Sequence, residues 1–110
     1  MAGSDVFTGT LDLLILRTLR GGPLHGYAIG RWIRESSDGV LQIEEGALYP
    51  ALHRLEKKGF IEAKWGQTEL KRPGRFYRLT RAGARRLTAE SDRWREHARA
   101  VAAVLDAEGG

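Results

Sequence analysis

Apolar residues recur with the spacing of a helix face in the first part of the chain. Between residues 11 and 19, four of them stand at positions i, i+3, i+4 and i+8, and further leucines lie between them. Thr8 or Thr10 can cap the start of this helix, and the Gly-Gly-Pro sequence at 21–23 ends it. Because the helix is apolar on more than one side, we expect it to be buried twice, by its own domain and by a partner subunit.

The pattern predicts two further helices. Residues 24–39 form the second, and its apolar candidates are Tyr27, Ile29, Trp32 and Ile33. After a short extended bridge, residues 45–58 form the third, which ends at Gly59. Its core face consists of Leu48, Ala51, Leu52 and Leu55. Pro50 is expected just past the start of the third helix, where its missing amide proton costs little because the first amides have no partner in the helix.

The two-residue period of a strand follows the third helix. Apolar and charged residues alternate over residues 60–65, as in a half-buried strand. The residues on its buried side are Ile61, Ala63 and Trp65. Residues 75–79 predict a second strand, and the long basic loop between the two completes a hairpin. Thr80 is expected to cap a last helix that continues to about Leu105.

The order helix, helix, helix, hairpin, helix predicts the fold class. It is mainly α with a small β-hairpin, arranged as a winged helix-turn-helix plus a C-terminal dimerisation helix. The chain has 110 residues, which fits one small domain. We therefore expect one compact unit, with the winged helix-turn-helix in residues 1–80 and the dimerisation helix and tail in residues 81–110.

Positive charge is confined to the middle of the chain. Residues 46–86 hold eleven Lys or Arg and three Glu, whereas residues 1–45 and 87–110 each carry a net charge of −2. A confined basic block indicates a polyanion such as nucleic acid as the partner, although a solvated basic face explains the same composition.

The third helix and the hairpin carry the candidate DNA contacts. Tyr49, His53 and Lys57 are spaced by four residues and form a stripe beside the core face, as in a recognition helix that enters the major groove. The full candidate set is Gly46, Tyr49, His53, Arg54, Lys57, Lys71, Arg72 and Arg75. The glycine allows close approach of the backbone, the tyrosine and histidine can hydrogen-bond to bases or phosphates, and the cations can neutralise phosphates. The last three flank Pro73-Gly74 at the expected hairpin tip, so we expect double-stranded DNA as the partner.

Other interpretations of this surface stay open. The stripe can be only the wet face of an amphipathic helix, and a winged helix can serve as a protein-interaction module without operator binding, although such modules tend to lose the basic hairpin. RNA binding would favour exposed aromatic residues on a sheet, whereas the aromatic residues of this chain are expected mostly in the core.

The last helix carries the pattern of a helix–helix contact. Six of its residues are separated alternately by four and three positions, as in an a/d heptad seam: Leu87, Ser91, Trp94, Ala98, Val101 and Leu105. Its small and polar members make the seam weak alone, so we expect the apolar first helix to complete it. The predicted homodimer interface is Leu11, Leu14, Leu87, Trp94, Ala98, Val101 and Leu105. The alternative is a last helix folded back on its own domain.

Four phrases of the sequence resemble the PadR-like transcriptional regulators. They are GTLDLLILRTL, GPLHGYAI, EEGALYPALHRLEKKGFIEAKW and GRFYRLTRAGARRL, in the family's order, and they cover most of residues 8–87. The resemblance implies a homodimeric winged-helix protein, usually a repressor, that binds an inverted-repeat operator. It also implies that Gly46, Tyr49, Lys71 and Arg72 lie near the DNA. The chain is similar to the shorter branch of the family, which has a single C-terminal helix.

The resemblance also implies a place for an effector. In some short PadR-like regulators a tryptophan of the C-terminal helix lines a cleft at the dimer centre and stacks on flat aromatic compounds. Trp94 holds a similar place, so the resemblance allows a small planar aromatic ligand there, with Leu14 and Ala98 as candidate walls. The other interpretation, a tryptophan of the dimer core that binds no ligand, is favoured because large aromatic side chains usually serve packing.

No pattern in the chain indicates catalysis, so we expect a protein that is not an enzyme and uses no cofactor. The three histidines lack metal-ligand spacing, and there is no cysteine to supply a thiolate. His25 is expected to be structural, at the turn into the second helix. The sequence contains no apolar run of membrane-spanning length and no leader, so we expect a cytoplasmic protein without a membrane partner.

Overall fold

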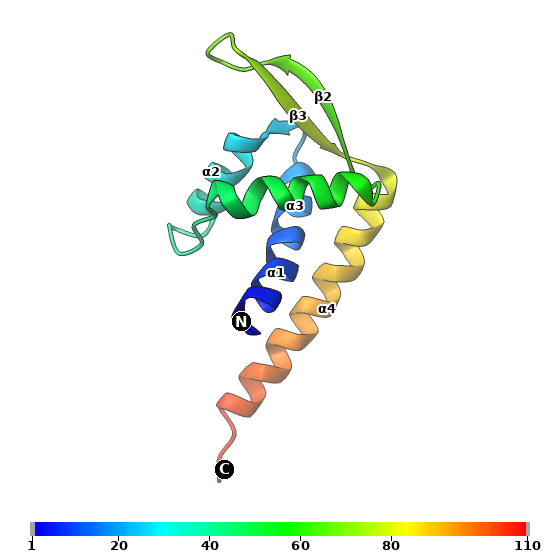
Figure 1. The fold of residues 1–110 in the computed structure, drawn as a ribbon. Coiled ribbons are helices and arrows are strands. Elements are labelled where there is room, and N and C mark those ends of the chain that lie inside the picture. The colour runs from blue at the N-terminus through cyan, green and yellow to red at the C-terminus, as the bar shows by residue number, and fades with distance from the viewer. Residues whose placement is uncertain (1, 110) are drawn as a thin grey trace.

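The computed structural model describes residues 2–109, with side chains described for residues 9–109. The elements are α1 (Ala2–Leu19), β1 (Leu24–His25), α2 (Gly26–Ser36), α3 (Glu45–Lys57), β2 (Ile61–Gln67), β3 (Pro73–Leu79) and α4 (Arg81–Leu105). Figure 1 shows α3 lying across α1, the β2–β3 hairpin standing beyond α3, and α4 running away from the hairpin to the far end of the molecule. The predicted class, mainly α with a small β element, is confirmed.

The first helix supplies the centre of the core. Ile15 and Leu16 are fully buried, and α1 contacts α2, α3 and α4. The predicted core face of α3 is confirmed, because all of its members are buried: Leu48, Ala51, Leu52 and Leu55. The predicted start of the first helix is wrong, since α1 begins at Ala2 and Thr10 lies inside it. The side chain of Thr8, the other predicted cap, lies outside the described residues.

A third strand joins the hairpin, and sequence periodicity did not predict it. β1 pairs antiparallel with β3, with His25 opposite Phe76, which gives the strand order β1-β3-β2. Two residues are too few to show an alternating pattern. His25 also caps α2, because its Nδ1 accepts a hydrogen bond from the Ala28 N–H at 3.3 Å. Its predicted structural role at this turn is confirmed.

Three aromatic side chains predicted for buried faces lie at the surface. Trp65 is 69% exposed because β2 extends beyond the core, so that exposure rises from the buried Ile61 through Ala63 to Trp65. On α2, Tyr27 is 61% and Trp32 38% exposed. The buried face of α2 is formed instead by Gly26, Ala28, Ile29 and Ile33. The expectation that the aromatic residues lie mostly in the core is therefore wrong.

Pro50 lies deeper in α3 than expected. It is the sixth residue of a helix that begins at Glu45, so the Gly46 carbonyl lacks the amide that would normally bond to it. The helix nevertheless continues to Lys57, because its core face stays buried on both sides of the proline.

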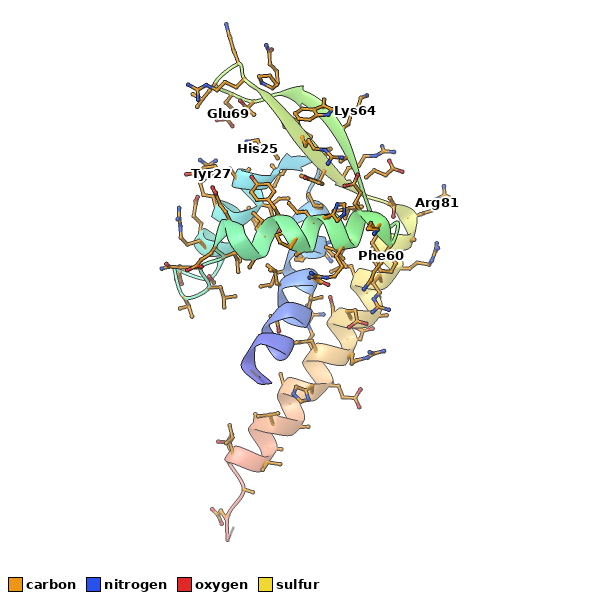
Figure 2. The ribbon with its side chains drawn as sticks, viewed as in Figure 1. His25, Tyr27, Phe60, Lys64, Glu69 and Arg81 are labelled. Atoms are coloured by element: carbon orange, nitrogen blue, oxygen red, sulfur yellow. The ribbon has the colours of Figure 1, made fainter. Side chains whose placement is uncertain are left out.

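A close junction fixes α4 to the turn between α3 and β2. The Thr80 Oγ1 accepts a hydrogen bond from the Gly83 N–H at 3.0 Å, which confirms Thr80 as the N-cap, and the Thr80 N–H donates to the Phe60 carbonyl at 3.1 Å. A Cβ at Gly83 would clash with that same carbonyl, so α4 approaches this closely only because the residue is glycine. The guanidinium of Arg86 lies 5.5 Å over the Phe60 ring, and Figure 2 shows Phe60 at this junction.

Candidate nucleic-acid interface

The polar stripe of α3 lies on the exposed side of the helix. Tyr49 is 46% exposed, and His53 and Lys57 are exposed as well. The Tyr49 ring rests against the start of α2, since a Cβ at Gly26 would lie 2.8 Å from the tyrosine Cε1. Gly46 has open space where a side chain would begin. The helix therefore presents an open backbone position and a row of polar side chains to the outside.

A hollow of about 440 Å³ separates this stripe from the hairpin. Three elements line it: Tyr49, His53 and Glu56 of α3; Thr68, Gly74, Arg75 and Tyr77 of the hairpin; and His25, Gly26 and Tyr27 at the start of α2. Burial raises the pKa of the Tyr77 phenol, and the nearby Arg75 guanidinium offsets part of that effect. Figure 2 shows His25 and Tyr27 between α3 and the hairpin.

Sequence reasoning missed Tyr27 and Thr68 as residues of this surface. Tyr27 was assigned to the core, yet it stands four positions before Arg31, whose guanidinium lies 5.8 Å over its ring. Residues four apart lie on the same face of a helix, so the charged Arg31 indicates that Tyr27 is on the exposed face of α2. Thr68 gives no such signal, because only the strand register shows that it begins the hairpin loop.

Two of the predicted phosphate contacts are held in ion pairs within the chain. The Arg54 Nη2 lies 2.6 Å from the Asp12 Oδ1 and ties α3 to α1. The Arg75 Nη2 lies 2.9 Å from the Glu56 Oε2 and ties β3 to α3. Arg75 is also not at the hairpin tip, because the strands pair as far as Gln67 opposite Pro73. Both arginines are thus placed to position α3 and the hairpin.

The hairpin tip carries exposed and unpaired cations. The loop between β2 and β3 closes through the Lys71 N–H bonding to the Thr68 carbonyl at 2.8 Å, with Lys71 in the left-handed region at a φ of 58°. The side chains of Lys71 and Arg72 are exposed, and neither forms an ion pair with another described residue. The same loop holds Glu69, which Figure 2 shows at the tip, so the tip is basic but not free of acid.

The predicted seam of α4 divides into a buried start and an exposed remainder. Leu87 is 3% exposed and Leu11 of α1 is 2% exposed, so both pack in the core of their own chain and offer little surface to a partner. Farther along, exposed apolar side chains follow one another: Trp94, Val101, Val104 and Leu105. Leu14 and Ala98 are partly exposed. Val104 was not predicted as part of this surface.

Trp94 lies between two hollows. One, of about 320 Å³, has Leu13, Leu14 and Ser91 among its lining residues. The other, of about 340 Å³, has Gly9, Leu13 and His97 among its lining residues. Trp94 is 49% exposed, so its ring can be contacted in the single chain.

Within the described part of the chain, no three His, Asp or Glu side chains gather in a way that could hold a metal ion. In the same residues, no helix combines the length and the apolar character needed to cross a bilayer.

Comparison with known proteins identifies relatives that match most of the chain. The sequence matches the family described as "Transcriptional regulator PadR-like family" over residues 15–89. "Uncharacterized protein X" of Lysinibacillus sphaericus is 35% identical over 96 residues, which cover 87% of this chain and 88% of that protein.

Solved structures agree with the family match. The structure of a transcriptional regulator from Clostridium thermocellum has 34% identity and a TM-score of 0.79, covering 88% of this chain and 94% of that one. A PadR family transcriptional regulator from Eggerthella lenta has 31% identity and a TM-score of 0.76, covering 98% and 99% of the two chains. The likeness confirms the predicted winged-helix fold with a single C-terminal helix.

Proposed function

This chain belongs to the PadR-like family of transcriptional regulators, and from that premise we propose that it is a repressor that binds an inverted-repeat operator as a homodimer. The family consists of transcriptional regulators rather than enzymes, so DNA-binding regulation is its general function. Such a protein acts where the DNA is, in the cytoplasm.

One observation carries the DNA-binding part of the proposal. The exposed stripe of α3 and the loop that bears the unpaired Lys71 and Arg72 border the same hollow, which Tyr49, His53 and Thr68 line together. A recognition helix and a hairpin so arranged can contact the two sides of one phosphate backbone.

The residues have separate roles in this proposal. Gly46, Tyr49 and His53 face bases and phosphates in the major groove, and Lys57 contacts phosphate. Lys71 and Arg72 reach phosphates of the neighbouring groove. Arg54 and Arg75 act by holding α3 and the hairpin in place through Asp12 and Glu56. In this division, residues 1–80 bind DNA, and residues 81–110 join the subunits together with Leu14 of α1.

The exposed part of α4 supports the homodimer. Large apolar side chains that the described residues leave exposed along one helix are expected to pack against a copy of themselves. The proposed contact surface is Leu14, Trp94, Ala98, Val101, Val104 and Leu105. A two-fold axis then places two copies of α3 about one DNA turn apart, which accounts for a palindromic operator.

A small planar aromatic effector is the remaining part of the proposal. The two hollows beside Trp94 and the exposure of its ring support stacking of a flat ligand, with Leu14 and Ala98 nearby as walls. Without a ligand, Trp94 serves only in the dimer core.

Selection of bound fragments from a genomic DNA library tests this function. We expect the selected fragments to share an inverted repeat, with two protein copies on each duplex by native mass spectrometry. Repeating the selection with flat aromatic compounds, for wild type and Trp94→Ala, tests the effector. Recovery of no common sequence would favour the protein-interaction module instead.

A further inference from the structure

The polar stripe of α3 begins one turn before Tyr49. Glu45 stands four residues before Tyr49, so Glu45, Tyr49, His53 and Lys57 share one exposed side of the helix. Gly46, next to Glu45, has no other described residue within 4 Å of its Cβ position, and Glu45 itself is exposed. If α3 enters the major groove, its first turn goes in deepest.

The carboxylate of Glu45 has no partner within the described chain. It makes no hydrogen bond and no ion pair, although Arg31 and Arg34 line the same groove of about 540 Å³ between α2 and α3. Arg31 pairs instead with Glu35, at 3.5 Å. An unpaired negative charge on a face that meets phosphates weakens DNA binding unless the carboxylate accepts a hydrogen bond there.

The major groove offers a carboxylate only two kinds of amino donor. These are the N4 amino group of cytosine and the N6 amino group of adenine. In an A·T pair the adenine amino group lies between two acceptors, its own N7 and the thymine O4, which repel the second carboxylate oxygen, whereas in a C·G pair the cytosine amino group has an acceptor, the guanine O6, on one side only. We propose that Glu45 accepts a hydrogen bond from a cytosine N4 in each half-site and thereby determines one base of the operator. This inference rests on the DNA-binding function proposed above.

Glu45 also has a purely structural account. A negative charge in the first turn of a helix is stabilised by the helix dipole, and this account gives Glu45 no part in base preference. Glu44 provides the control, because it lies at the same end of α3, is exposed and has no side-chain cap hydrogen bond. Glu44 falls outside the stripe, since the residue four positions later is the buried Leu48.

The experiment selects binding sites from one random duplex library with wild type, Glu45→Gln and Glu44→Gln. Circular dichroism first checks that each variant folds. We expect wild type to select a cytosine at one position of each half-site. For Glu45→Gln, the ratio of affinities for cytosine over thymine at that position should fall about tenfold or more, or the preference should move to adenine, which glutamine can bind through N6 and N7. Glu44→Gln should keep the wild-type ratio.

Two results would overturn the inference. One is an unchanged base preference in Glu45→Gln. The other is an equal change in both variants, which would mean that charge near the helix end matters and base contact does not. A wild-type protein that selects no inverted repeat refutes the proposed function itself, so the two failures are distinguishable.

Discussion

α3 and α4 are both amphipathic helices, yet they leave opposite kinds of side chain in solvent. The exposed side of α3 is polar, and its apolar side is fully used by the core. α4 has only Gly83 and Leu87 buried and leaves Trp94 and Val101 exposed farther along. A helix whose apolar face is covered needs no further protein, whereas an uncovered apolar face calls for one. This contrast is the reason for proposing two different partners, DNA for α3 and a second copy of the chain for α4.

The largest expected effect comes from placing a charge on the exposed apolar face of α4. Trp94→Glu would bury an unpaired carboxylate in the proposed dimer contact, which costs about 3–5 kcal/mol. We expect monomers by light scattering and loss of specific operator binding. Ala103→Glu adds the same charge to the same helix at an exposed position outside the heptad seam, and should remain dimeric. A dimeric Trp94→Glu would place the interface elsewhere.

A second effect concerns the hairpin tip. Replacing Lys71 and Arg72 by alanine removes two phosphate contacts per subunit, so the dependence of log affinity on log salt should lose roughly 1.8 units for each subunit. Fluorescence anisotropy with operator DNA at several salt concentrations measures this slope. Arg81→Ala with Arg85→Ala removes the same charge from the start of α4, away from the tip in Figure 2, and should leave the slope nearly unchanged. Equal slopes for wild type and the tip variant would remove the tip from the interface.

The stripe of α3 gives a smaller effect. Tyr49→Ala should weaken operator binding by about 1–3 kcal/mol, because a contact at a base or its phosphate is lost. Tyr49→Phe keeps the ring that rests against Gly26 and removes only the hydroxyl. If the hydroxyl makes the contact, both variants lose affinity alike in anisotropy titrations. If the ring matters through its packing, only Tyr49→Ala loses affinity. Wild-type affinity in both variants would exclude Tyr49 from the DNA-binding residues.

The smallest effect is confined to alkaline solution. Burial raises the pKa of Tyr77 in the folded chain above the value of 10.0 for a free tyrosine. Below that pH the phenol is neutral in both states, and its full contribution to stability is present. As the pH rises above 10.0, the Tyr77 phenol ionises in the unfolded chain before it ionises in the folded chain. The free energy of unfolding therefore falls until the pH has passed the folded-state pKa of Tyr77. Urea unfolding at about pH 9 and pH 11 should show a smaller fall for Tyr77→Phe than for wild type. Tyr27→Phe, which alters an exposed tyrosine, should keep the wild-type fall.

The sequence alone predicts the features that depend on local spacing and misses those that depend on contacts between distant residues. The core face of α3 and the Thr80 cap follow from local spacing, and both were predicted correctly. The ion pair of Arg54 with Asp12 joins residues 42 positions apart, and no local pattern announces it. Trp65 continues the predicted alternation of β2, but it lies beyond the end of the core and is exposed. Periodicity along one strand does not show how far the elements packed against that strand extend, so it could not predict this exposure. The positions of the DNA-binding residues and the dimer contacts stay predictions.

The contacts at Phe60 fix the first turns of α4 and so affect where its far end lies. The Phe60 carbonyl accepts a hydrogen bond from the Thr80 N–H and the Phe60 ring is covered by Arg86, so the turn that closes α3 is tied directly to the first turns of α4. α4 has 25 residues and is therefore about 37 Å long. Tilting a helix of this length by about 5° displaces its far end by about 3 Å, which is close to the spacing of successive base pairs. In the proposed homodimer, a small change of angle between the two α4 helices would therefore change the distance between the two copies of α3 by about one base-pair step.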